Sequence, residues 1–90
     1  MRVLSSQKLE VIDMSTHELK IHPKHFVLVF LKVKKAELRN NDRDFKCGDI
    51  LVLREWLDGY TGRSTVRNVT HVADVSDYLP GYVLISMEQP

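Results

Sequence analysis

Near its middle the chain reads Gly48-Asp49-Ile50-Leu51-Val52-Leu53-Arg54-Glu55-Trp56, which contains the clearest strand signal in the sequence. Gly48-Asp49 is typical of a turn, and the apolar run after it predicts a strand over 50–56 that is buried on both faces at its start. Asp58 to Gly62 contains two glycines within four residues, which predicts a hairpin. The return strand is expected over about 63–73, with a bulge because its alternation is imperfect.

A helix is expected before this hairpin. His17 to His22 alternates polar and apolar residues up to a proline, which predicts a strand. Pro23 suits the first turn of a helix. Because Phe26, Val27, Phe30 and Leu31 would form one apolar stripe, we predict a short helix from about 23 to 32.

Two further strands are indicated. Alternation over 35–39 places Lys35, Glu37 and Arg39 on one face and Ala36 and Leu38 on the other, so one face carries charge and not core. A last strand is expected over 82–87, after the turn at Leu79-Pro80-Gly81. Residues 9–14 fit either a strand or a helical turn.

Many short strands with one helix predict an α+β, mostly β class. A small twisted sheet curled into a partly closed barrel would remove strand edges, and the helix would cap one end. Ninety residues support one domain. We expect this domain over 16–90, with residues 1–15 as an N-terminal extension of uncertain structure.

Composition limits the function classes. The chain is 43% hydrophobic and 28% charged, and no apolar run approaches the roughly 18 residues that span a bilayer, so no membrane partner is expected. The first residues lack a secretory signal, so we expect a cytoplasmic protein. Cys47 is alone, which excludes an internal disulfide and suggests a small buried residue.

Charge is small overall but uneven. The net charge of +1 excludes a heavily basic, non-specific nucleic-acid binder. Residues 31–46 nevertheless contain six basic and three acidic side chains, whereas residues 74–90 contain three acidic side chains and no base. An anionic partner should therefore meet the first of these segments.

The order of motifs resembles the short bacterial and phage branch of the ASCH domains, which belong to the PUA-like superfamily. The resemblance covers about residues 16–87 and rests on the His-Glu-Leu-Lys strand, the proline-started helix, Lys34-x-x-Glu37-x-Arg39, Asn41-Asp42-Arg43-x-Phe45, Gly48-Asp49, Tyr60-Thr61-Gly62-Arg63 and Pro80-Gly81-Tyr82. It implies a PUA-like barrel with a helix closing one end and a cleft beside the motif. It also implies binding of RNA or a nucleotide.

Two positions depart from the pattern of that family. Lys32 stands where the ASCH signature has glycine, so the helix must end without the residue that best tolerates a left-handed conformation. Some small ASCH proteins are amidohydrolases acting on N4-acylated cytidine with a Lys-x-x-Thr motif, and here Glu37 replaces the threonine nucleophile. A carboxylate is a poor nucleophile toward an amide, so the family mechanism does not carry over intact.

The candidate ligand contacts combine bases with one acid and one aromatic ring. Lysine and arginine would take a phosphate, Glu37 would orient Arg39 or accept from a base amino group, and Tyr60 would stack on a base. The alternatives are a solvated strand face with weak ion pairs, and a rigid hairpin tip. The predicted site residues are Lys34, Glu37, Arg39, Arg43, Tyr60 and Arg63.

Other functions remain open at this point. Hydrolysis of a modified nucleoside would use Lys34 as base with a water assisted by Glu37. A phage-type protein-interaction module leaves no mark in the sequence. Four histidines, at positions 17, 22, 25 and 71, lack the spacing of a closed metal site. We therefore expect RNA or a nucleotide as partner, no metal or cofactor, and a monomer or weak dimer.

Overall fold

The computed structural model describes residues 14–90, so the possible strand or helical turn at 9–14 lies almost wholly outside the described residues. The elements are β1 (Thr16–Ile21), α2 (Pro23–Phe30), β2 (Ala36–Asn40), β3 (Ile50–Trp56), β4 (Tyr60–Asp74) and β5 (Tyr82–Glu88). Each corresponds to an element expected from the sequence. The largest differences in bounds are in β4, which begins three residues early, and in α2, which ends two residues early.

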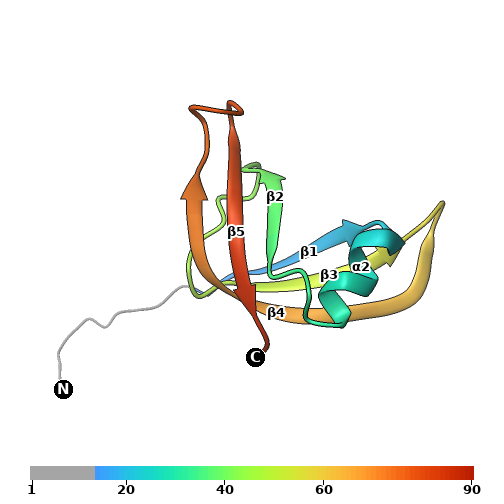
Figure 1. The fold of residues 1–90 in the computed structure, drawn as a ribbon. Coiled ribbons are helices and arrows are strands. Elements are labelled where there is room, and N and C mark those ends of the chain that lie inside the picture. The colour runs from blue at the N-terminus through green and yellow to red at the C-terminus, as the bar shows by residue number, and fades with distance from the viewer. Residues whose placement is uncertain (1–13) are drawn as a thin grey trace, which may run out of the picture.

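The five strands form one curled sheet in the order β1-β3-β4-β5-β2. The β1–β3 pair is parallel and the other pairs are antiparallel. The long strand β4 belongs to both halves of the sheet, because its first part pairs with β3 and its last part pairs with β5 (Figure 1). The register shifts between Val69 and His71, which confirms the expected bulge. The fold is therefore mostly β, a half-barrel with one short helix.

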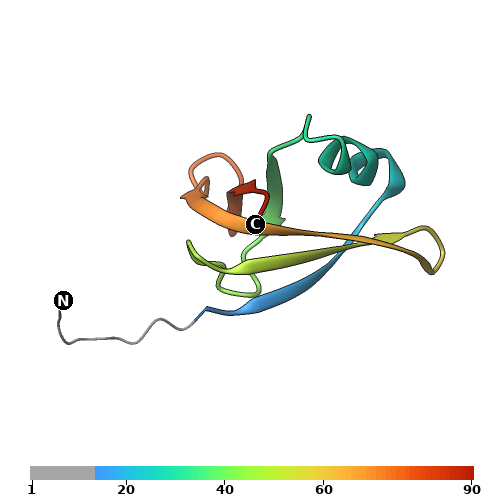
Figure 2. The same ribbon diagram turned by 90° about the horizontal axis from the view of Figure 1, so that it is seen from below.

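The helix α2 lies over the concave side of the curled sheet (Figure 2). Alternate residues of β1, β3 and β5 are buried, as period-2 patterning requires. The buried apolar residues are Leu19, Ile21, Phe26, Val29, Phe45, Leu51, Leu53, Val69, Val83, Ile85 and Met87. Cys47, which we expected to be buried, is exposed because the loop after β2 carries it outside this cluster.

The predicted apolar stripe of the helix is right at Phe26, which is buried, and wrong at its other three residues. The helix α2 packs on β3 through Phe26 and Val29, whereas Phe30 and Leu31 are 57% and 61% exposed. Pro23 and the His22 N-cap fix the start of the helix, and the His22 ring accepts a hydrogen bond from the Lys24 amide. The helix has only eight residues, and only Phe26 and Val29 of it are buried against the sheet.

The helix ends in a Schellman motif, the usual pair of hydrogen bonds around a left-handed residue. The Lys32 amide donates to the Val29 carbonyl and the Val33 amide to the Leu28 carbonyl, both at 2.9 Å. Lys32 itself has φ 65°. A lysine thus takes the left-handed position that glycine usually takes at the end of a helix.

Candidate functional site

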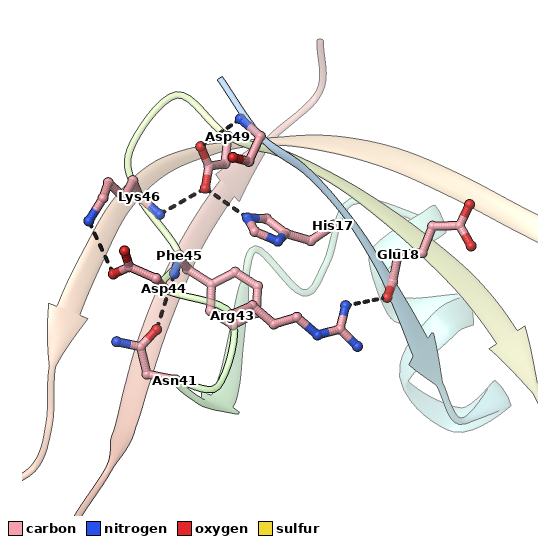
Figure 3. A network of polar contacts seen from close by, with 9 residues as sticks. His17, Glu18, Asn41, Arg43, Asp44, Phe45, Lys46 and Asp49 are labelled. Atoms are coloured by element: carbon pink, nitrogen blue, oxygen red, sulfur yellow. Dashed lines mark hydrogen bonds and ion pairs between the residues drawn. The ribbon is translucent and has the colours of Figure 1, made fainter. Parts of the chain in front are cut away.

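The curl of the sheet brings its two edge strands, β1 and β2, toward each other. Within residues 14–90, the backbone of β1 pairs only with β3 and that of β2 only with β5. Two arginines cross the seam between the edges. Arg39 Nη2 donates to the Lys20 carbonyl at 2.9 Å. Arg43 Nη1 donates to the Glu18 carbonyl at 2.8 Å, as Figure 3 shows. Side chains therefore close the half-barrel where ladder hydrogen bonds would close a full barrel.

A hollow of about 430 Å³ lies at this seam, and we call it the seam hollow. It is lined by Lys20, Ile21, His22, His25, Lys34, Glu37, Leu38, Arg39, Asn40 and Tyr82. Five of these residues are basic and one is acidic. The hollow therefore combines basic residues, two of them histidines, with a single carboxylate.

Glu37 is the centre of the polar contacts in the seam hollow. It is 6% exposed, and its Oε1 lies 2.8 Å from Lys34 Nζ. Its Oε2 accepts from Arg39 Nε at 3.1 Å and lies 3.0 Å from Arg39 Nη2. Lys34 Nζ also donates to the Ala36 carbonyl. Two cations thus hold one carboxylate in place.

The pairing of β2 with β5 explains why these side chains point inward. Glu37 lies opposite Ile85, which is fully buried, and Arg39 lies opposite Val83. The sequence correctly grouped Glu37 and Arg39 on one face, and the alternative of a solvated strand face does not hold for the buried Glu37. It faces the interior of the curl, and Leu38 on the other face is 51% exposed. Curling places the charged face of β2 opposite β1, where ion pairs and hydrogen bonds satisfy it.

The structure brings together three of the six predicted site residues. Lys34, Glu37 and Arg39 meet in the seam hollow. Arg43 lies further along the same seam, at the Glu18 carbonyl. Tyr60 packs edge-on against Trp56, with ring centroids 4.9 Å apart, and the Arg54 guanidinium lies over its ring. Arg63 binds a different carboxylate.

That carboxylate belongs to Glu55, which the sequence analysis did not single out. It is 3% exposed and accepts from Arg63 Nε at 2.9 Å, from Arg63 Nη2 at 2.7 Å and from Thr61 Oγ1 at 2.6 Å. The hydrogen bonds from Arg63, and then that from Thr61, lower the pKa of Glu55 to about 2. One signal was available: Glu55 follows Leu51 and Leu53 at the buried positions of an alternating strand.

The pairing of Glu55 with Arg63 predicts that the stability of the fold depends on pH. Because the folded pKa of Glu55 is below its ordinary 4.5, its ionised form stabilises the fold above about pH 4.5, and this contribution is lost as pH falls toward 2. Glu55→Gln should lower the urea midpoint strongly near neutral pH and much less at about pH 2.5. The exposed Glu18→Gln is the control. A Glu55→Gln deficit that is equal at both pH values would contradict the charged pairing.

A second missed carboxylate orders the loop that joins β2 to β3 (Figure 3). Asp49 is 2% exposed, and it accepts from His17 Nε2 at 2.8 Å, the Lys46 amide at 3.0 Å and the Ser15 amide at 3.2 Å. Burial opposes ionisation, but the hydrogen bonds, led by that of His17, outweigh it and lower the pKa of Asp49. The sequence indicated only a turn at Gly48-Asp49, because a carboxylate beside a glycine is common in turns.

The described residues show neither a metal site nor a membrane span. Among residues 14–90, no three His, Cys, Asp or Glu side chains are grouped as ligands of a metal ion. No helix in the same range has the length and apolar character needed to cross a bilayer.

Two comparisons identify proteins that this chain is similar to. Residues 16–87 match DUF3850, a domain of unknown function. A protein of Escherichia phage P2, described as "Uncharacterized 12.9 kDa protein in GpA 3'region", is 47% identical over 70 residues. That alignment covers 77% of this chain but 64% of the phage protein, so this chain matches less than two thirds of its relative. The match of residues 16–87, from β1 into β5, shows that the chain belongs to the DUF3850 family.

Proposed function

We propose that the seam hollow binds RNA, or a nucleotide-sized part of it. One observation carries the proposal: Lys34, Glu37 and Arg39 converge on a hollow that His22 and His25 also line, whereas the Lys20 ammonium lies over the Trp56 ring. Such a wall suits a phosphate, and an acceptor set among donors suits a base edge. The excess of basic residues over 31–46 places positive charge on the same segment.

The contacts of Glu37 and Arg39 leave capacity for a ligand. Lys34 binds Oε1 of Glu37, while both Arg39 contacts go to Oε2. A carboxylate has about four acceptor sites, so Oε1 can still accept from an exocyclic amino group of cytosine or adenine. Arg39 Nη1 has no hydrogen-bond partner among residues 14–90 and can donate to a phosphate oxygen. Glu37 would then supply base preference and Arg39 affinity.

We further propose that this chain is an ASCH-type member of the PUA-like superfamily. The support is the curled sheet with its short helix, together with Lys34, Glu37 and Arg39 meeting in one hollow. A left-handed residue at Lys32, the glycine position of the motif, agrees with the same geometry. The phage relative fits the bacterial and phage branch. As compartment we propose the cytoplasm, because an exposed lone thiol such as that of Cys47 suits a reducing environment.

The surroundings of Lys34 favour binding over hydrolysis. Its Nζ lies 2.8 Å from the Glu37 carboxylate and donates to the Ala36 carbonyl, so contacts within the protein hold it in place. A general base must be within reach of the water that it activates, whereas Lys34 is already engaged by protein groups. Incubation with N4-acetylcytidine should therefore release no cytidine. Release that depends on Lys34 would support the amidohydrolase alternative.

Arg39→Ala tests the binding function. We expect affinity for a short single-stranded RNA to fall about tenfold, and the slope of log affinity against log salt to flatten by about one, because one phosphate contact is lost. Filter binding at several salt concentrations measures both quantities. Arg54→Ala, which removes an arginine paired with Glu18 outside the seam hollow, is the control. An Arg39→Ala affinity and slope equal to those of the wild type would reject this site.

A further inference from the structure

A second hollow of about 410 Å³ adjoins the first, and we call it the lysine hollow. It is lined by Lys32, Lys34, Lys35, Arg67, Thr70, Met87, Glu88 and Gln89. Lys34 also lines the seam hollow, so one side chain joins the two. Four of the eight lining residues are cationic and one is anionic. The lysine hollow therefore carries more positive charge than its own residues neutralise.

Arg67 is buried in this wall without a carboxylate partner. It is 6% exposed, and within residues 14–90 no carboxylate lies within ion-pair distance of it. Its Nη2 donates to the Val29 carbonyl at 2.8 Å, and its Nη1 donates to Thr65 Oγ1 and to the Val66 carbonyl, each at 2.7 Å. Its Nε has no acceptor among the same residues.

An unpaired guanidinium in this position is unusual, because a buried charge is expensive unless an opposite charge offsets the loss of water. The contact with the Val29 carbonyl, near the negative end of α2, supplies part of that compensation. It leaves the Nε donor unused. Arg63, on the same strand, shows the ordinary solution, since it binds the buried Glu55 carboxylate through two nitrogens. Arg67 is thus a buried cation with an unused donor, which an anionic ligand could satisfy.

Lys32 adds a second, independent observation. It holds φ 65° at the end of α2, a conformation that is strained for a residue with a Cβ but not for glycine. Glycine would complete the Schellman motif without that cost. A cation is instead present at a strained position on the rim of the lysine hollow, and backbone strain of this kind is often linked to function.

We infer that the lysine hollow is a phosphate subsite, in which Arg67 and Lys32 hold the phosphate of a ligand whose base occupies the seam hollow. This inference rests on the proposed function for the identity of the ligand. The phosphate can be a terminal monoester or an internal phosphodiester, since both present anionic oxygens to the same donors. Because Lys34 lines both hollows, the phosphate and the base of a single ligand could occupy them together.

Lys32→Gly separates binding from folding, because it removes the cation and also the backbone strain. Titrations followed by ¹H–¹⁵N NMR should show cytidine 5′-monophosphate binding about tenfold tighter than cytidine to the wild type. Lys32→Gly should weaken the monophosphate about three- to tenfold and leave cytidine unchanged. Its melting temperature should equal or exceed that of the wild type. Lys24→Ala, an exposed cation outside both hollows, should behave as the wild type.

Further titrations test the role of Arg67 and whether the bound phosphate is terminal or internal. Inorganic phosphate should shift the Arg67 Nε–H resonance of the wild type, and Lys35→Ala should weaken this effect without any change in backbone strain. A short RNA with a 5′-phosphate that binds tighter than the same RNA with a 5′-hydroxyl would indicate a terminal phosphate. Equal affinity, with the Arg67 shift retained, would indicate an internal one.

The failures of the two proposals are distinguishable. If cytidine perturbs the seam hollow while Lys32→Gly and inorganic phosphate change nothing, the phosphate subsite is overturned and base binding stands. If phosphate shifts Arg67 while neither nucleoside nor RNA perturbs the seam hollow, the subsite stands and the proposed function fails. A lower melting temperature for Lys32→Gly with unaltered monophosphate affinity would assign Lys32 to structure alone.

Discussion

Asp49→Ala should lower the free energy of unfolding by about 3–5 kcal/mol, because it leaves three donors without an acceptor and each buried unsatisfied donor costs about 1–3 kcal/mol. Those donors are the amides of Ser15 and Lys46 and the ring of His17. They tie the start of β1 to the loop before β3. Loss of Asp49 should therefore loosen the one parallel strand pair of the sheet, where Ser15 also bonds Ile50.

Urea unfolding measures this change. Asp42→Ala is the matched control, because Asp42 is an exposed aspartate in the same loop and its replacement should change stability by less than about 0.5 kcal/mol. The midpoint should fall for Asp49→Ala and stay fixed for Asp42→Ala. Equal and small effects of the two variants would mean that the Asp49 network adds nothing to the fold.

Glu37→Ala should cost about 2–3 kcal/mol of stability, somewhat less than the roughly 3–5 kcal/mol for breaking a fully buried pair. The smaller figure follows from the exposure of the two cations. The side chains of Lys34 and Arg39 are 25% and 24% exposed, so water screens their charges in part once the carboxylate is gone. Glu37 is nevertheless the only carboxylate bound to either cation among residues 14–90.

Glu18→Ala provides the comparison for Glu37→Ala. Glu18 pairs with Arg54 at 3.4 Å on the surface, with 63% of its side chain exposed, and should contribute about 0–1 kcal/mol. Thermal and urea unfolding of both variants measure the difference. If Glu37→Ala were as mild as Glu18→Ala, the seam hollow would be an ordinary solvated surface and its carboxylate would have no special role.

Local patterning was enough to predict the strands. The apolar run of β3, the paired glycines after it and the alternation of β1 each describe short-range geometry, and the observed strands follow them. Helix patterning was less reliable, because the eight residues of α2 contain apolar side chains on several faces. Its contact with β3 selects Phe26 and Val29, and a single sequence does not contain that choice.

Predicting the site required more knowledge of long-range geometry than predicting the strands. Period-2 alternation grouped Glu37 with Arg39, but only the curl of the sheet turns that face toward β1 and the interior. The local sequence also does not show which group a charged side chain will bind. Arg63 was expected to contact a ligand, yet it binds the carboxylate of Glu55, eight residues away. Glu55 was predictable in principle, because a carboxylate at a buried position of a strand needs a partner.

The most direct test of the RNA-binding proposal is an NMR titration of the wild-type protein with a single-stranded RNA of about eight nucleotides. We expect the amide shifts to lie in residues that line the seam hollow, around Lys20 to His25, Lys34 to Asn40 and Tyr82. Shifts confined to the outer face, around Trp56 and Tyr60, or no shifts at all at low salt, would contradict it.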